Sequence, residues 1–312
     1  MFKSVEFSSS SQGYKLYIKE FKRRVFGFLS TKSLDYFLRG QDIISVNPIV
    51  NGEHEPELTD LIAHFNKIGY RDFLIDIGAN IGLTSCQNGL FFKRVLCFEP
   101  NPLCVHILKV NTEIALSNNS FEINEFGLGK SDAELDLWIP KHNWGGAFVK
   151  SNDNSYASPD AILASKDGFS EIDKTNYFIK KIQIRSCKDV LEEKFSSLLN
   201  DGFNNGVIKI DVEGMEEVVL KGISQSIPDN FKVMIVFENW NPNFNVNEIN
   251  EYFSKLQTSF FMLSRKNPYE TWTKLIKRLA LLFGKSKLLL IPLETSERNV
   301  GDVVIQIGSL VE

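Results

Sequence analysis

Short, nearly continuous apolar segments recur along residues 72–238, and longer stretches with helical periodicity separate them. The apolar segments are 72–77, 94–98, 121–126, 207–212 and 233–238. Strands that are apolar on both faces are typical of a parallel sheet covered by helices on each side. Helices are expected between them, at about 82–92, 102–116, 214–222 and 247–257. This alternation predicts an α/β fold with a doubly wound, mainly parallel sheet. Residues 259–264 and 302–308 could add an antiparallel end.

Residues 1–50 differ from this pattern. Eight basic side chains stand against three acidic ones within the first forty residues, and apolar residues recur at helical spacing over part of 14–29. We therefore expect an N-terminal basic appendage, helical or extended, followed by one α/β domain over residues 51–312.

Two segments interrupt the alternation within that domain. Residues 130–187 contain strand-like pieces at 134–139 and 181–186 around a long polar loop, and we expect this insertion on the acceptor side of the site. Residues 265–300 form an amphipathic insertion, with a helix expected at 271–287. That helix could pack on the domain, on a second copy of the chain or on a membrane surface, and these alternatives stay open.

Charge and cysteine content exclude several functional classes. The 312 residues include 35 basic and 39 acidic side chains, which leaves no chain-wide footprint for nucleic acid. Membrane-spanning helices need about 18 apolar residues in a row, and no such run occurs. Serines at positions 8–11 stand where a signal peptide would be apolar. The four cysteines form no CxxC pair, so we expect reduced thiols and a cytoplasmic protein.

The segment that follows the first expected strand reads Asp76-Ile77-Gly78-Ala79-Asn80-Ile81-Gly82. A glycine-rich turn between strand and helix lets a ligand approach the backbone closely. A dinucleotide site would need glycines at 78, 80 and 83, where the chain has Gly78, Asn80 and Leu83. Asp76 would also repel a pyrophosphate, whereas it suits the ammonium and sulfonium of S-adenosylmethionine. The residues therefore favour S-adenosylmethionine over NAD.

An acidic residue stands at the end of the second expected strand. Glu99 lies 21 residues after Gly78, near the offset of about 20 at which a carboxylate accepts hydrogen bonds from ribose hydroxyls. On its own, Glu99 would be read as a surface acid at a strand end. Its combination with the glycine turn predicts a nucleoside-binding role.

Three motifs together resemble the FkbM family of methyltransferases: DIGANIG at 76–82, FEPNP at 98–102 and KIDVEG at 209–214. The resemblance extends from Gly52 to Glu238. It implies a class I methyltransferase fold that is Rossmann-like, S-adenosylmethionine as donor, and methylation of a hydroxyl, often on a sugar or a polyketide. The basic N-terminal arm and the 265–300 insertion depart from the family pattern and leave the acceptor open. The expected cofactor-binding residues are Asp76, Gly78, Ala79, Asn80, Gly82, Glu99, Pro100 and Asn101.

Carboxylates end the fourth and fifth expected strands. Asp211 and Glu213 follow the fourth, and Glu238 and Asn239 end the fifth, so we expect them near the transferred methyl group. One carboxylate could act as a general base toward the acceptor hydroxyl. Alternatively, Asp211, Glu238 and Asn239 could bind Mg²⁺, which would lower the pKa of that hydroxyl. Glu213 could instead cap the helix that begins near Gly214.

Three further side chains could belong to an acceptor site. His142 could act as a base or contact the substrate, although a surface histidine would look the same in sequence. Trp144 and Trp240 could stack on a sugar ring or pack within the fold.

We predict an S-adenosylmethionine-dependent methyltransferase that methylates a hydroxyl of a sugar, glycan or natural product. The acceptor would be a small molecule or glycan, with no nucleic-acid partner, and a homo-oligomer stays open. A nicotinamide-dependent oxidoreductase and a non-catalytic binding protein with a cofactor fold are the alternatives. A methyltransferase acting on protein or nucleic acid is disfavoured by the near-neutral charge.

Overall fold

A computed structural model describes residues 5–8, 36–40, 42–151, 153–154, 173–239, 246–266, 287–293 and 301–309. The predicted helix over part of 14–29 lies outside the described residues. So do Trp240 and all of the predicted helix at 271–287 except its last residue.

The centre of the molecule is a parallel sheet, as predicted. Its strands run in the spatial order β4 (Ser120–Asn124), β3 (Arg94–Phe98), β2 (Phe73–Ile77), β9 (Asn205–Ile210) and β10 (Lys232–Asn239). All four neighbouring pairs are parallel. The first of these five strands along the chain, β2, lies in the middle. The chain then builds one half with β3 and β4 and the other half with β9 and β10, which is the doubly wound arrangement.

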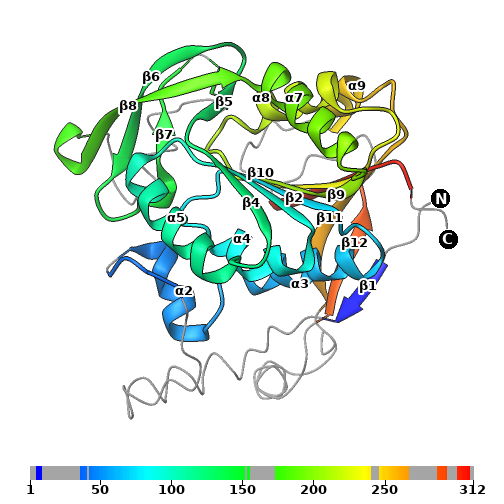
Figure 1. Ribbon diagram of the computed structural model, residues 1–312, viewed down its shortest axis with the longest axis horizontal. Helices are drawn as coiled ribbons and strands as arrows, with labels where there is room; N and C mark the ends of the chain where they lie inside the picture. The colour runs from blue at the N-terminus through cyan, green and yellow to red at the C-terminus, as the bar shows by residue number, and fades with distance from the viewer. Residues whose placement is uncertain are drawn as a thin grey trace, which may run out of the picture.

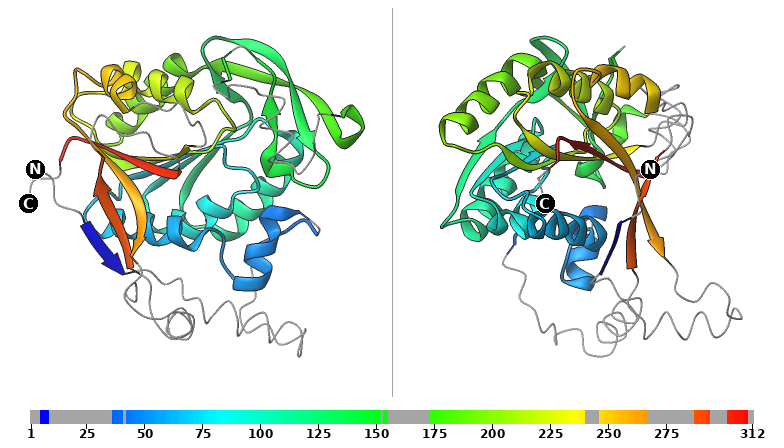
Figure 2. Two further views of the ribbon diagram at one scale, coloured as in Figure 1. Left: turned by 180° about the vertical axis from the view of Figure 1, so that it is seen from behind. Right: turned by 90° about the vertical axis from the view of Figure 1, so that its right-hand side faces the viewer.

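The sheet continues beyond β10 with antiparallel strands. β13 (Gly301–Ile307) pairs with β10, and β11 (Thr258–Lys266) pairs with β13, which confirms the predicted antiparallel end. Two strands that the sequence did not predict extend it: β12 (Lys287–Pro292) and β1 (Val5–Ser8). Figure 2 shows β1 beside β12 at the sheet edge, so residues from both ends of the chain belong to this sheet.

Alternate residues of each central strand face two separate helical layers. In β2, Phe73, Ile75 and Ile77 pack in the apolar cluster that includes α7 (Cys187–Asn200), α8 (Glu216–Ser226) and α9 (Val246–Tyr252). Leu74 faces the cluster with α3 (Pro56–Lys67) and α5 (Pro102–Ala115), next to the short α4 (Leu83–Asn88). Figure 1 shows the two layers above and below the sheet. Burial on both faces explains why these strands are continuously apolar.

A second, smaller sheet lies beside the carboxyl edge of the parallel strands. Its order is β5 (Gly127–Gly129), β8 (Tyr177–Ser186), β6 (Ala133–Pro140) and β7 (Phe148–Val149). β6 and β8 contain the strand-like pieces predicted at 134–139 and 181–186. They pair antiparallel over eight positions. Their inward residues alternate with exposed charges such as Glu134 and Asp136, as in a half-buried strand.

Three helices were not predicted from the sequence, and one predicted helix is divided in the structure. α2 (Ile43–Asn51), α3 and α7 were not predicted, although Ser186 caps α7 and Pro56 begins α3. The helix predicted at 82–92 is divided into α4 and the 3-10 turn η1 (Gly89–Phe91), and two other turns, η2 (Trp144–Gly146) and η3 (Lys174–Asn176), flank the small sheet. No helix among the described residues could cross a membrane. The four cysteines of the protein are buried and form no disulfide.

Candidate functional site

The loop after β2 brings the ends of β2 and β9 into direct contact. Gly78 has a φ of +81°, and a Cβ atom there would lie 1.8 Å from the carbonyl oxygen of Asp211. The backbone amide of Asp211 donates to Ile77 O at 2.9 Å, and the amide of Gly78 donates to Phe98 O at 2.9 Å. Only glycine fits this position, so the loop is held between β3 and β9.

Glu99 lies directly beside this loop. Its two carboxylate oxygens accept hydrogen bonds from the backbone amides of Asn80 at 2.7 Å and of Asn101 at 2.8 Å. Its relative exposure is 7%. Burial raises the pKa of Glu99 to about 7, although these two hydrogen bonds oppose the rise. Glu99 therefore organises the turn and also faces the adjoining cavity.

Asp76 has partners that differ from those predicted. It is fully buried, its Oδ2 accepts a hydrogen bond from Ser85 Oγ at 2.6 Å, and its Oδ1 lies 3.2 Å from Lys209 Nζ. Lys209 also donates to Gly78 O at 2.8 Å and lies 3.5 Å from Asp211 Oδ2. Asp76 supports the loop from beneath through Lys209, and does not contact the cavity above it.

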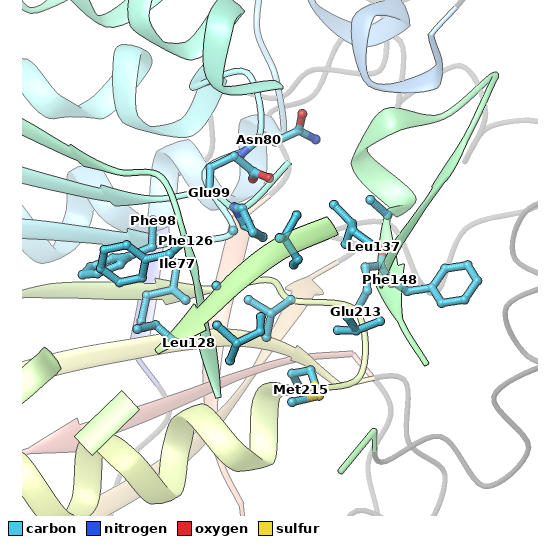
Figure 3. A pocket seen from close by; sticks show the side chains of 18 of the residues that line it. Ile77, Asn80, Phe98, Glu99, Phe126, Leu128, Leu137, Phe148, Glu213 and Met215 are labelled. Atoms are coloured by element: carbon cyan, nitrogen blue, oxygen red, sulfur yellow. The ribbon is translucent and has the colours of Figure 1, made fainter. Parts of the chain in front are cut away.

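A cavity of about 800 Å³, including its open mouth, lies between the glycine loop and the small sheet. Four of the predicted cofactor-binding residues line it: Gly78, Asn80, Glu99 and Pro100. The other four support it from outside. Besides Asp76, Ala79 packs in the core, Gly82 begins α4 against Leu108, and Asn101 caps α5. Figure 3 shows Asn80 and Glu99 at one side of the cavity and Leu137 at another, with the ring of Phe148 directed away from it.

The apolar part of this cavity was not predicted from the sequence. Phe126 and Leu128 follow β4, and the inner face of the small sheet contributes further apolar side chains, namely Leu135, Leu137, Val149, Ile182 and Ile184. The ring of Phe148, next to Val149 in β7, packs on the other face against Trp138 and Tyr177. The signal was the two-residue alternation within β6 and β8. Because of this placement, the described part of the 130–187 insertion covers the same cavity as Gly78 and Glu99.

The ionisable side chains that line this cavity are all acidic among the described residues. They are Glu99, Asp211 and Glu213, with no lysine, arginine or histidine beside them. Such a wall attracts a cationic ligand and repels a pyrophosphate. Asp211 has 42% of its side chain exposed, whereas Glu213 is buried at 7%.

A second cavity, of about 700 Å³ including open space, adjoins Asp211 on its other side. Its lining includes Asp211, Glu238 at the end of β10, Asp302 at the start of β13, and Glu55 before α3. Of the three carboxylates predicted to converge, Asp211 and Glu238 share this cavity. Glu213 shares only the first cavity with Asp211. Asp211 therefore lines both cavities.

Glu238 and Asp302 are directly opposite in the antiparallel pairing of β10 with β13. Like charges in this position destabilise a sheet. Burial raises the pKa of Asp302 to about 6, and Glu238 and Asp211 add to the rise. A pair that opposes folding in this way is typical of a functional site.

Helix α8 has Met215 at its N-cap, with no side-chain capping hydrogen bond from that residue, so the structure does not place Glu213 as the cap. Glu216, the first residue of α8, instead holds the turn that precedes the helix. The carboxylate of Glu216 accepts hydrogen bonds from the amides of Gly214 and Val212, at 3.0 and 3.3 Å. Asn239, the third ligand considered for Mg²⁺, is buried and lies outside the lining of both cavities. Among the described residues, no group of three or more His, Cys, Asp or Glu side chains is arranged to hold a metal ion.

The two remaining candidates from the 141–147 loop differ in position. Trp144 lines the first cavity, and the guanidinium carbon of Arg39 lies 4.3 Å from its ring centroid. One face of that ring is therefore occupied by a side chain and is closed to a sugar. His142 is half-buried and lies outside the lining of both cavities.

Comparison with known proteins gives matches of three kinds. A family model described as "Methyltransferase FkbM domain" matches residues 76–261, more than half of the chain. Methyltransferase sdnD of Sordaria araneosa is 28% identical over 181 residues, which are 55% of this chain and 67% of that protein. Among solved structures, the O-methyltransferase from Bacillus cereus in complex with SAH aligns with a TM-score of 0.40 and 12% identity, over 94% of this chain and 97% of that one.

A second solved structure, the SAM-dependent methyltransferase from Agrobacterium tumefaciens, aligns with a TM-score of 0.38 and 6% identity, over 81% of this chain and 62% of that one. The mainly parallel sheet with an antiparallel end is the class I methyltransferase fold that the motifs predicted. The family match begins at Asp76, below the glycine loop, and ends within β11, so it contains the residues where the two cavities meet. The chain belongs to the FkbM family of methyltransferases.

Proposed function

We propose that this protein transfers a methyl group from S-adenosylmethionine to a hydroxyl oxygen of a small-molecule or glycan acceptor, with a sugar as the favoured acceptor. The observation that carries the proposal is the position of Asp211, which lines both the first cavity, at the glycine loop, and the second cavity, with Glu238 and Asp302. A group at this boundary can act on an acceptor in one cavity while the donor occupies the other.

The residues of the glycine-loop cavity fit the donor. Gly78 permits close approach to the backbone, and Asn80 beside it would hold the methionine part. Glu99 would accept hydrogen bonds from the ribose hydroxyls. The apolar wall around Phe126 and Leu128 suits an adenine ring. The acidic lining balances a ligand that carries an ammonium and a sulfonium, and S-adenosylmethionine supplies a methyl group activated by its positive sulfur.

The chain's contribution to the chemical step is to position the acceptor and remove its proton. Asp211 is the exposed carboxylate at the boundary, so it is the proposed general base for the hydroxyl. Glu238 and Asp302 would accept hydrogen bonds from neighbouring hydroxyls of the same acceptor. Lys209, which contacts both Gly78 O and Asp211, would hold the proposed base at a fixed position relative to the glycine loop.

Two measurements test the proposal. Calorimetric titration of the full chain should show saturable binding of S-adenosylhomocysteine, and NAD should not bind tightly. In a methyl-transfer screen against glycans and small hydroxylated acceptors, Asp211→Asn should lower turnover by ~10²-fold or more with little change in donor affinity. Asp201→Asn is the matched control, because Asp201 is exposed in the turn after α7. Full turnover by Asp211→Asn would refute its assignment as the base.

The same assay separates a base mechanism from one assisted by Mg²⁺. Because Asn239 lies outside both cavity linings, the geometry favours the base. We therefore expect turnover to survive EDTA. Loss of turnover with EDTA and recovery with Mg²⁺ would establish metal coordination instead.

A cytoplasmic location and a homo-oligomer stay predictions. Fractionation of cells tests the location, and light scattering of the purified chain tests the oligomeric state.

A further inference from the structure

Residues 36–40 and 42–44 precede the family match, and Phe37 among them is linked to the glycine loop through one side chain. The side chain of Asn111, fully buried on α5, holds the backbone of Phe37 with two hydrogen bonds: it accepts from Phe37 N at 2.6 Å and donates to Phe37 O at 3.1 Å. It also donates to the carbonyl of Ile81 in the glycine loop at 2.7 Å. One buried amide thus ties this N-terminal segment to the loop that borders the first cavity.

The same segment holds Trp144 by its ring and by its backbone. The Arg39 guanidinium stacks on the indole at 4.3 Å, and it donates hydrogen bonds to Asp42 Oδ2 at 2.8 Å and to the carbonyl of Lys141. Asp42, which has 2% exposure, accepts from the amide of Trp144 at 3.2 Å through that same oxygen. Asp42 also caps α2 by accepting from Ile44 N. Arg39 and Asp42 therefore hold the Trp144 loop by ring stacking and by hydrogen bonds to its backbone, while Asp42 is itself fixed at the start of α2.

The opposite side of the loop rests on the donor site. The carbonyl of Trp144 accepts from Asn101 Nδ2 at 3.4 Å, and Asn101 is the cap of α5 beside Glu99. The backbone of Gly145 approaches Asn80 so closely that an added Cβ would lie 2.5 Å from Asn80 Nδ2. Trp144, Gly145 and Asn80 all line the first cavity. The position of this wall is thus set from two sides.

We propose that residues 36–40 and 42–44 form a clamp that completes the donor site, and that Arg39 and Asp42 are positioning residues that set donor affinity through Trp144. The inference rests on the proposed donor site, and it adds to that site a segment from outside the matched domain. Neither Arg39 nor Asp42 lines the cavity, so their effect on binding has to pass through the loop that they hold.

The test is a double-mutant cycle on the full chain, read as the dissociation constant for S-adenosylhomocysteine by calorimetry. Arg39→Ala and Trp144→Ala should each weaken binding by about tenfold. The double variant should bind no more weakly than the weaker-binding single variant, because the effects of coupled residues on binding free energy are not additive. Arg71→Ala is the matched control, because Arg71 is exposed before β2, at the other end of the sheet, and should leave the constant unchanged.

Thermal midpoints without ligand separate this role from a merely structural one. A structural role alone would lower the midpoint and leave the dissociation constant unchanged. If Arg39→Ala fails to fold, Asp42→Asn is used, since it keeps the side-chain size and weakens the contacts to Arg39 and Trp144. Binding by a folded Arg39→Ala or Asp42→Asn within about twofold of the wild type would overturn the inference, as would full additivity in the cycle. Failure of the wild type to bind would refute the proposed function itself.

Discussion

Lys209 Nζ lies 3.2 Å from Asp76 Oδ1 beneath the glycine loop, and both side chains are almost inaccessible to solvent. The same nitrogen donates to Gly78 O and approaches Asp211. Burial opposes the charge of Lys209, but Asp76 and Asp211 outweigh it and raise its pKa well above the ordinary value. The ammonium group of Lys209 thereby links the glycine loop to Asp211, the proposed base.

Lys209→Met should destabilise the protein by roughly 3–5 kcal/mol, because it leaves Asp76 buried without its ion pair. Urea unfolding measures the change. Adding Asp76→Asn should recover part of the loss, since the double variant no longer buries an unpaired charge. Lys181→Met, which removes an exposed lysine of β8, should leave the unfolding midpoint nearly unchanged. An unchanged midpoint for Lys209→Met would contradict this account of the ion pair.

Gly78→Ala should abolish donor binding or folding, because its Cβ would overlap the carbonyl oxygen of Asp211. Gly202→Ala is the matched control: Gly202 has nearly the same φ, +78°, with nothing within 4 Å of an added Cβ. The control should cost only about 1–2 kcal/mol, the price of the left-handed backbone. Calorimetric binding and thermal unfolding of both variants separate steric overlap from backbone strain. Normal donor binding by Gly78→Ala would mean that the two strand ends can separate freely.

Glu99→Gln should weaken S-adenosylhomocysteine binding at pH 8 by about 10- to 100-fold, the scale of hydrogen bonds to a charged group. Because burial raises the pKa of Glu99 to about 7, wild-type affinity should increase with pH as Glu99 ionises through that value. The difference between wild type and variant should therefore shrink below pH 6. Titrations at several pH values measure it, with exposed Glu113→Gln as control. A difference that is constant with pH would exclude Glu99 as the titrating contact.

Asp302→Asn should stabilise the protein at pH 8 while lowering turnover. The pKa of Asp302 is raised to about 6 from its ordinary value of 3.8, so its ionisation opposes folding. That cost is complete above pH 6 and absent below pH 3.8, so the advantage of the variant should fade as the pH drops through this window. Urea unfolding at pH 8 and pH 4.5 checks the sign. Wild type more stable than variant at pH 8 would contradict the like-charge pairing with Glu238.

The local pattern of the sequence was sufficient for much of the fold. The strand predicted at 94–98 has the same bounds as β3, and the helix at 102–116 differs from α5 by one residue. Apolar runs and the turn residues between them are short-range features, so the residues within each segment are enough to predict it. The glycine loop and Glu99 were found for the same reason, because a strand–turn–helix unit of fixed length places them together.

Local patterns in the sequence were thus enough to predict the parallel sheet, the glycine loop and the acids at the ends of β9 and β10. Which side chains meet could be known only from the tertiary structure. Lys209 reaches Gly78 from 131 positions away, Asp302 comes to lie opposite Glu238, and Arg39 reaches Trp144. These contacts depend on strand order and register. Strand order and register are set by how the whole chain buries its apolar faces, and the spacing of residues within one segment carries no information about that.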